Sequence, residues 1–153
     1  RMKIKLFLLA LFLLSAFLFA TPAQAQVHPG IRTGAYFDPD AFFVGGDILV
    51  PIARSWWLNP NLELGFGDVD IVTANFDFHY DFDVSSNLYV WAGAGPAILH
   101  FNPDGRAPSD TDFGVNLFMG IGFKTSGRIV PYIQPKVILS DNSQFVLGFG
   151  LRF

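Results

Sequence analysis

The most regular feature of the chain is an alternation of large apolar residues with polar or small ones, and it is clearest at the C-terminus. From Phe145 to Phe153 every second residue is Phe or Leu, while Val146, two glycines and Arg152 lie between them. Successive side chains of a β-strand point to opposite faces, so one face of this segment is apolar and the other is small or charged. This combination is expected where the first face contacts lipid and the second lines the lumen of a membrane-spanning barrel.

The same alternation predicts further strands along the chain. Residues 72–82 show it as clearly, and a helix would scatter their apolar and polar sets around its circumference. The predicted strands span residues 30–37, 42–52, 56–67, 72–82, 88–101, 112–124, 128–139 and 145–153. Their lengths match the roughly 10 residues that a tilted membrane strand needs. The predicted fold class is therefore all-β: an eight-stranded antiparallel up-and-down transmembrane β-barrel.

An even number of strands returns the chain to the side from which it started. That topology makes residues 53–55, 85–87 and 125–127 periplasmic turns and residues 102–110 an extracellular loop. Prolines within strands conflict with a closed barrel, because it offers no free edge to accommodate them. Pro51 and Pro131 fall near strand ends, and Pro96 is expected to mark a bulge or a corner. Pro135 has no explanation from the pattern alone.

The N-terminus has the organisation of a secretory signal. Lys3 and Lys5 precede an apolar run over residues 6–20, and Ala23 and Ala25 form the small-x-small pattern of a cleavage site. The run is shorter than the roughly 20 residues that a membrane-spanning helix needs. We therefore expect residues 1–25 to be a cleaved signal peptide and residues 26–153 to be the barrel domain. An uncleaved membrane anchor is the alternative.

Composition removes several other classes of protein. Residues 26–153 hold seven Lys or Arg and thirteen Asp or Glu, so a nucleic-acid-binding surface is not expected. The chain has no cysteine, which excludes disulfides, thiolate metal sites and a lipid-modified cysteine. Its mean hydropathy is nevertheless +0.38, and no apolar run after the signal is long enough for a transmembrane helix. The hydrophobicity is spread over alternating strands instead.

Charged residues within the predicted strands share the inward face. The acids lie on the second to fourth strands and the bases on the first and the last three, so they occupy facing walls of a closed barrel. We expect Arg32 and Lys136 to reach Glu63, Asp47 and Asp77 across the lumen. The predicted ion-pair network comprises Arg32, Asp47, Glu63, Asp77, His79, Lys136 and Arg152.

This network can be read as a plug of paired charges or as a selectivity ring for small solutes. An eight-stranded barrel is only just wide enough for side chains to fill it, which favours the plug. The many inward glycines favour a channel unless large side chains occupy the space. The candidates for that filling are Tyr36, Tyr89, Trp91, Phe118 and Tyr132.

The signal sequence, the alternating strands and the terminal Gly-Leu-Arg-Phe resemble the small outer-membrane β-barrel family of OmpX or OmpA-transmembrane-domain type. The resemblance implies a bacterial outer-membrane location, with outer-membrane lipids and lipopolysaccharide as partners. It also implies that Phe149, Leu151 and Phe153 form the signal read by the outer-membrane assembly machinery, with periplasmic chaperones acting beforehand; Phe153 can also serve as an interfacial aromatic. The short extracellular connections depart from this family and argue against a protruding adhesive sheet.

Several residues invite a more specific function. His100 is expected near the outer leaflet beside Ser109 and Asp110, where a lipid A hydrolase would act, but the His-x-Ser-Asn run of the family deacylases is absent. No G-x-S-x-G or H-E-x-x-H motif occurs either. His79 lies between two inward acids, and no inward serine is expected near it. The aromatics predicted to lie at the membrane interface are Trp56, Trp57, Tyr80, Phe82 and Phe123.

The sequence therefore predicts a non-enzymatic integral outer-membrane barrel with a structural or envelope role and a largely filled polar lumen. No cofactor is expected. No metal is expected either, because Asp104, Asp110 and Asp112 lack the ligand spacing of a calcium loop. The alternative is a narrow diffusion channel or small-ligand carrier, and a lipid A-modifying enzyme comes third.

Overall fold

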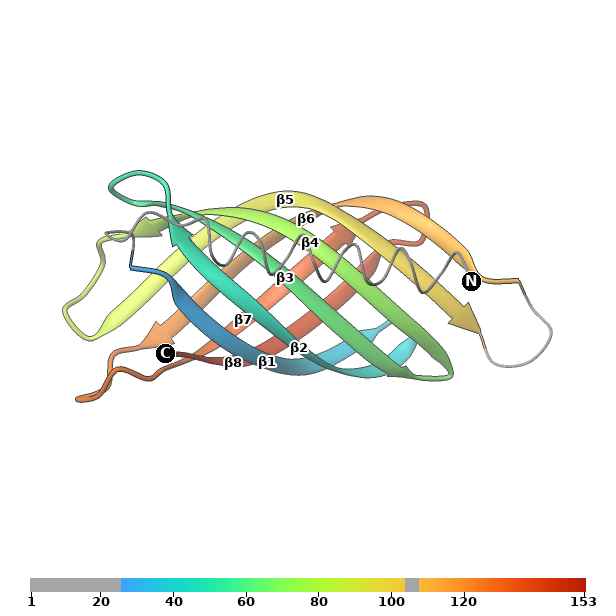
Figure 1. Ribbon diagram of the computed structural model, residues 1–153, viewed down its shortest axis with the longest axis horizontal. Helices are drawn as coiled ribbons and strands as arrows, with labels where there is room; N and C mark the ends of the chain where they lie inside the picture. Colours follow the sequence, from blue (N-terminus) through green and yellow to red (C-terminus); the bar gives the residue numbers. More distant parts are fainter. Residues whose placement is uncertain (1–25, 104–107) are drawn as a thin grey trace.

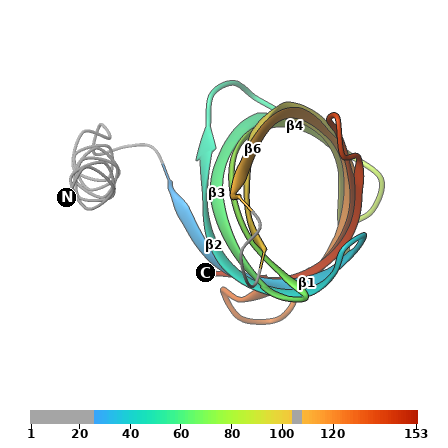
Figure 2. The same ribbon diagram turned by 90° about the vertical axis from the view of Figure 1, so that its right-hand side faces the viewer.

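The computed structural model describes residues 26–103 and 108–153, and these form a closed antiparallel barrel of eight strands in the order β1 to β8 (Figure 1). Each strand pairs with its neighbours in the sequence, and β1 pairs with β8 to close the ring, which is seen end-on in Figure 2. The strands are β1 (His28–Phe37), β2 (Asp40–Pro51), β3 (Trp56–Gly67), β4 (Val69–Phe82), β5 (Leu88–Pro103), β6 (Asp110–Phe123), β7 (Val130–Leu139) and β8 (Gln144–Arg152). The fold predicted from alternation is confirmed. The predicted signal peptide, residues 1–25, lies outside the described residues.

The two ends of the barrel differ in what they carry. The start of β1, the end of β8 and the turns at 52–55, 83–87 and 124–129 lie together at one end, which we call the terminal end. The turns at 38–39, 68 and 140–143, the end of β5 and the start of β6 lie at the other, distal end. In Figure 1 the terminal end is on the left. Among residues 26–103 and 108–153 no helix is long and apolar enough to cross a membrane.

The outer face of the barrel is apolar along its whole height. Outward side chains such as Phe76, Phe113 and Phe145 remain exposed, Phe113 at 76% of its surface. Within the described strands the charged residues on this face are Asp40 and Asp70, and both lie at the distal end. Because a charge near the bilayer midplane costs about 2–4 kcal/mol for Arg or Lys, this segregation suits a surface that contacts lipid.

Aromatic side chains ring the outer face near the terminal end. The ring of Tyr80 lies 5.2 Å from that of Trp56 and 5.2 Å from that of Phe82, both edge to face. Phe123 is also exposed on this face. Trp57 differs from the sequence-based expectation of an interfacial residue: it follows Trp56 by one position, so it points inward, where its ring lies 5.9 Å from His28.

Three prolines lie on the outward face and interrupt one ladder each without shifting its register. Pairing is missing at Pro60 between β2 and β3, at Pro96 between β4 and β5, and at Pro135 between β6 and β7. Proline has no N–H to donate, so the gap falls where its ring replaces that donor. The register is the same on both sides of each gap. The bulge or corner expected at Pro96 is therefore absent, and Pro135 is accommodated in the same way.

Candidate functional site

Large side chains inside the barrel lie opposite glycines on the neighbouring strands. Trp91 on β5 pairs with Gly120 on β6, and Tyr132 on β7 pairs with Gly150 on β8. A Cβ atom added to Gly120 would lie 2.2 Å from Cε2 of Trp91, and one added to Gly150 would lie 2.3 Å from Cζ of Tyr132. The inward glycines are therefore the spaces that these rings occupy, and they do not leave an open lumen at these positions.

The middle of the lumen is organised around Glu63 on β3, the only glutamate in the sequence and 0% exposed. The Nζ of Lys136 donates to both carboxylate oxygens, at 2.9 and 3.0 Å. The Nε of Arg32 lies 3.2 Å from Oε1, and the hydroxyl of Tyr36 donates to Oε2. Because these partners come from β1 and β7, the cluster bridges the lumen from wall to wall. We call Glu63, Arg32, Lys136 and Tyr36 the central cluster.

Asp47 has partners other than those expected from the sequence. Asn59 donates to Asp47 Oδ2 at 2.8 Å, and the Nε of Arg152 lies 3.8 Å from the same oxygen. Arg32 and Lys136 make their close ionic contacts with Glu63 instead. The cations of the lumen are thus divided between two carboxylates: Arg32 and Lys136 pair with Glu63, and Arg152 lies beside Asp47.

Asp77 is held by amides. Asn61 donates to Oδ2 at 2.9 Å, and Asn116 donates to Oδ1 at 2.7 Å. Asn116 lies on β6 and reaches Asp77 on β4 across the intervening β5, where the residue is Gly95. A Cβ at Gly95 would lie 2.6 Å from Cα of Asp77, so glycine here allows the backbones of β4 and β5 to approach closely beneath this contact. Alternation alone places Asn61 and Asn116 on the inward face without indicating this role, and the available signal is the inward glycine, Gly95, on the strand between Asn116 and Asp77.

The terminal half of the lumen is aromatic. The ring of His79 stacks on Trp91 at 5.7 Å, and its Nε2 lies 3.3 Å from Oδ1 of Asp81. The guanidinium of Arg152 lies 4.7 Å from the ring centres of both Trp91 and Tyr132. These contacts are cation–π in geometry and bury a charge against aromatic faces. His79 and Arg152 thus belong to the aromatic layer, apart from the central cluster.

The distal half of the lumen is apolar, which differs from the polar lumen expected from the sequence. Inward side chains from six strands pack there into one buried cluster: Tyr36, Ala41, Phe43, Ile71, Ala97, Leu99, Phe101, Ile138 and Val146. From the terminal to the distal end the interior therefore changes from aromatic to ionic to mainly apolar. Each layer is filled by the chain's own side chains.

The other predicted sites are separate from this interior. Phe149, Leu151 and Phe153 lie exposed on the outer face at the terminal end, where the backbone N–H of Phe153 donates to the carbonyl oxygen of Pro29 at 2.9 Å. His100 also faces outward, near the distal end, and its Nδ1 lies 2.8 Å from Oγ1 of Thr111. In the described part of the chain no group of three or more metal-ligating side chains comes together, and Asp104 lies outside that part.

Comparisons with known proteins rest on structure, because no protein-family model and no curated protein matches the sequence. The N-terminal β-barrel domain of Pseudomonas aeruginosa OprF superposes with a TM-score of 0.74 at 18% identity, covering 85% of this chain and 98% of that domain. Neisserial surface protein A gives a TM-score of 0.66 at 13% identity, with 82% and 94% covered. The fold is that of a small outer-membrane β-barrel.

This likeness and the apolar outer face both agree with the outer-membrane location that the sequence predicted. The outer-membrane enzyme PagL shares the fold as well, with a TM-score of 0.57 at 11% identity, covering 82% of this chain and 98% of that one. At such identities the fold is shared without implying a shared activity. Function therefore has to be argued from this chain's own side chains.

Proposed function

We propose that the protein is a non-enzymatic structural component of the outer membrane whose lumen is closed by its own side chains. The observation that carries this proposal is the central cluster, in which one buried carboxylate is shared by a lysine, an arginine and a tyrosine from two other strands. Both carboxylate oxygens of Glu63 are already engaged by these side chains, so the carboxylate is not available to a passing cation.

The layers on either side of the cluster support the same function. Toward the terminal end, Trp91 and Tyr132 fill the space over Gly120 and Gly150. Toward the distal end the nine residues of the apolar cluster pack across the lumen and present mainly hydrocarbon surface to an ion in transit. A hydrated solute would have to displace all three layers. In this proposal the terminal end faces the periplasm, and Phe149, Leu151 and Phe153 serve assembly there.

Planar-bilayer recording tests whether the lumen is closed. We expect protein that shows the heat-dependent gel mobility of a folded barrel to give no stepwise conductance in symmetric salt, because each layer excludes water. Discrete openings whose size scales with salt would contradict the proposal and favour the narrow channel. A change of their ion selectivity in a Lys136→Met variant would then place the conducting path through the central cluster.

A second candidate function rests on the pair formed by His100 and Thr111. A hydroxyl beside an imidazole is the minimal arrangement for nucleophilic attack on an ester, and this pair faces outward near the distal end, beside the outer leaflet in the proposed orientation. Within residues 26–103 and 108–153 no carboxylate forms an ion pair with His100, so the arrangement is less complete than a triad.

Mass spectrometry of lipid A tests this second candidate. If the pair is catalytic, cells that produce the protein lose an acyl chain from lipid A, and cells that produce His100→Ala or Thr111→Val retain it. Identical lipid A in cells with and without the protein would eliminate the candidate. His28→Ala, at the opposite end of the barrel, is the matched histidine control.

A further inference from the structure

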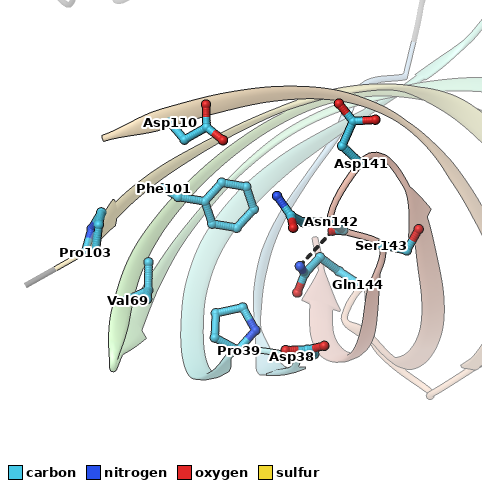
Figure 3. A pocket seen from close by; sticks show the side chains of 10 residues that line it. All are labelled: Asp38, Pro39, Val69, Phe101, Pro103, Asp110, Asp141, Asn142, Ser143 and Gln144. Atoms are coloured by element: carbon cyan, nitrogen blue, oxygen red, sulfur yellow. Dashed lines mark hydrogen bonds between the residues drawn. The ribbon is translucent and has the colours of Figure 1, made fainter. Parts of the chain in front are cut away.

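A cavity of about 480 Å³ opens at the distal end of the barrel, apart from the central cluster. Its walls come from the β1–β2 turn, the distal ends of β4, β5 and β6, and the β7–β8 turn. In Figure 3 Asp110 and Asp141 stand at one edge and Asp38 at the opposite edge, with Phe101, Asn142 and Gln144 between them. These turns and strand ends thus form an open cavity above the apolar cluster of the lumen, and we call this cavity the bowl.

Gln144 supplies an unused hydrogen-bond acceptor to this bowl. The side chain is only 3% exposed, and its Nε2 donates to the carbonyl oxygen of Asn142 at 2.8 Å. That bond fixes the orientation of the amide, because only the nitrogen can donate to a carbonyl. The Oε1 atom is then left buried with no hydrogen-bond partner among the described residues. A buried acceptor left unpaired costs free energy, and a ligand with an N–H group would satisfy it.

The charge of the bowl is one-sided. Among the described residues that line it, Asp38, Asp110 and Asp141 are acids and none is Lys or Arg. Near its floor the Nδ2 of Asn142 donates to Oδ2 of Asp112 at 3.0 Å, which places a further carboxylate beside the bowl. A neighbouring buried carboxylate therefore adds to the negative potential. Such a surface attracts cations and repels phosphate and sulfate groups.

The remaining walls are apolar, which narrows the class of cation. Pro39, Val69, Phe101 and Pro103 line the bowl beside the acids. A bare metal ion would gain nothing from these side chains. It would also lack a coordination sphere, since no three metal-ligating side chains converge in the described residues. An organic cation with an apolar body and at least one N–H group satisfies the acids, the apolar walls and Gln144 together.

We propose that the distal cavity binds a small organic ammonium ion, with the cationic N–H group donating to Oε1 of Gln144 and the apolar body resting against Phe101 and the flanking prolines. The inference is independent of whether the lumen conducts, because the cavity lies on the distal side of the apolar cluster. In the orientation proposed above it opens to the cell exterior.

Titration of the folded full-length barrel with benzylammonium tests the site, by calorimetry in a zwitterionic detergent. We expect saturable binding with a Kd on the order of 0.1–1 mM, the range open to a ligand of about eight heavy atoms. Gln144→Leu should weaken binding about tenfold, because it removes the buried acceptor with little change of volume. Asp38→Asn combined with Asp141→Asn should weaken it severalfold. Asp83→Asn, which removes the same charge at the terminal end, should leave binding unchanged.

Three related probes separate this site from less specific ones. Benzyltrimethylammonium keeps the charge and the ring but has no N–H group, so it should bind at least about fivefold more weakly. Benzyl alcohol lacks the charge, and equal binding of it would overturn the proposal in favour of simple partitioning. Displacement of benzylammonium by submillimolar Ca²⁺ would overturn it in favour of a metal site. Absence of saturation at 10 mM, or an unchanged Kd for Gln144→Leu, would also overturn it.

Discussion

Replacing Glu63 by Gln should destabilise the barrel more than any other single charge removal in the lumen, by about 3–5 kcal/mol. The glutamine keeps the shape of the side chain but leaves Arg32 and Lys136 facing each other without an anion, and both are buried. Neither cation can turn to water in a filled lumen. Urea unfolding in lipid vesicles, followed by heat-dependent gel mobility, measures the change.

The double variant Glu63→Gln with Lys136→Met provides the check on this cause. It removes one of the two stranded cations, so its loss of stability should be smaller than the sum of the two single losses, with a coupling of at least about 1 kcal/mol. Asp83→Asn in the exposed turn at residues 83–87 is the matched control and should change stability by less than about 0.5 kcal/mol. If Glu63→Gln behaved like Asp83→Asn, the central cluster would not stabilise the fold.

Gly120→Ala should have the second largest effect, a loss of about 1–3 kcal/mol from a single added methyl group. The added Cβ would lie 2.2 Å from the ring of Trp91. That ring is held on its other sides by Gln134, which accepts its Nε1–H at 3.0 Å, and by Arg152 over its face. It therefore has no free direction in which to move. Unfolding in urea gives the free energy, and near-ultraviolet circular dichroism reports displacement of the indole.

Gly46 on β2 offers a matched control for this substitution. It faces outward, and the nearest atom to an added Cβ is 3.7 Å away, so Gly46→Ala should be nearly neutral. In a Trp91→Ala background the cost of Gly120→Ala should largely disappear, since the clashing ring is gone. Equal costs at Gly120 and Gly46 would mean that the loss comes from the strand backbone and not from the packed lumen.

The fold was predictable because, in every strand of a membrane barrel, residues that face lipid alternate with residues that face the lumen. Each residue of 72–82, for example, lies on the face that alternation assigned to it, and the same holds for β8. Strand ends were less predictable: β4 begins at Val69 and β5 extends to Pro103, beyond the predicted 72 and 101. Those ends depend on pairing with the neighbouring strand, which one-dimensional periodicity does not contain.

The interior was less predictable than the fold. Alternation identifies which residues face inward, but the partner of each depends on the stagger between strands. Arg32 and Lys136 therefore could not be divided between Glu63, Asp47 and Asp77 from sequence. The acceptor on Gln144 could not be found from the sequence either, because it lies in a cavity that forms only where two turns and the ends of three other strands meet.

The position of the central cluster also bears on how long the barrel persists once it has formed. Lys136 on β7 and Glu63 on β3 lie four strands apart around the ring, so they meet only across the closed lumen, whereas Arg32 on β1 reaches Glu63 over Gly45 of β2. Before closure Lys136 can remain hydrated, so its pairing with Glu63 contributes little to the rate at which the ring closes. Interactions absent from the transition state slow unfolding instead. We therefore expect the ion pair between Lys136 and Glu63 to slow unfolding of the closed ring without changing how fast the ring closes.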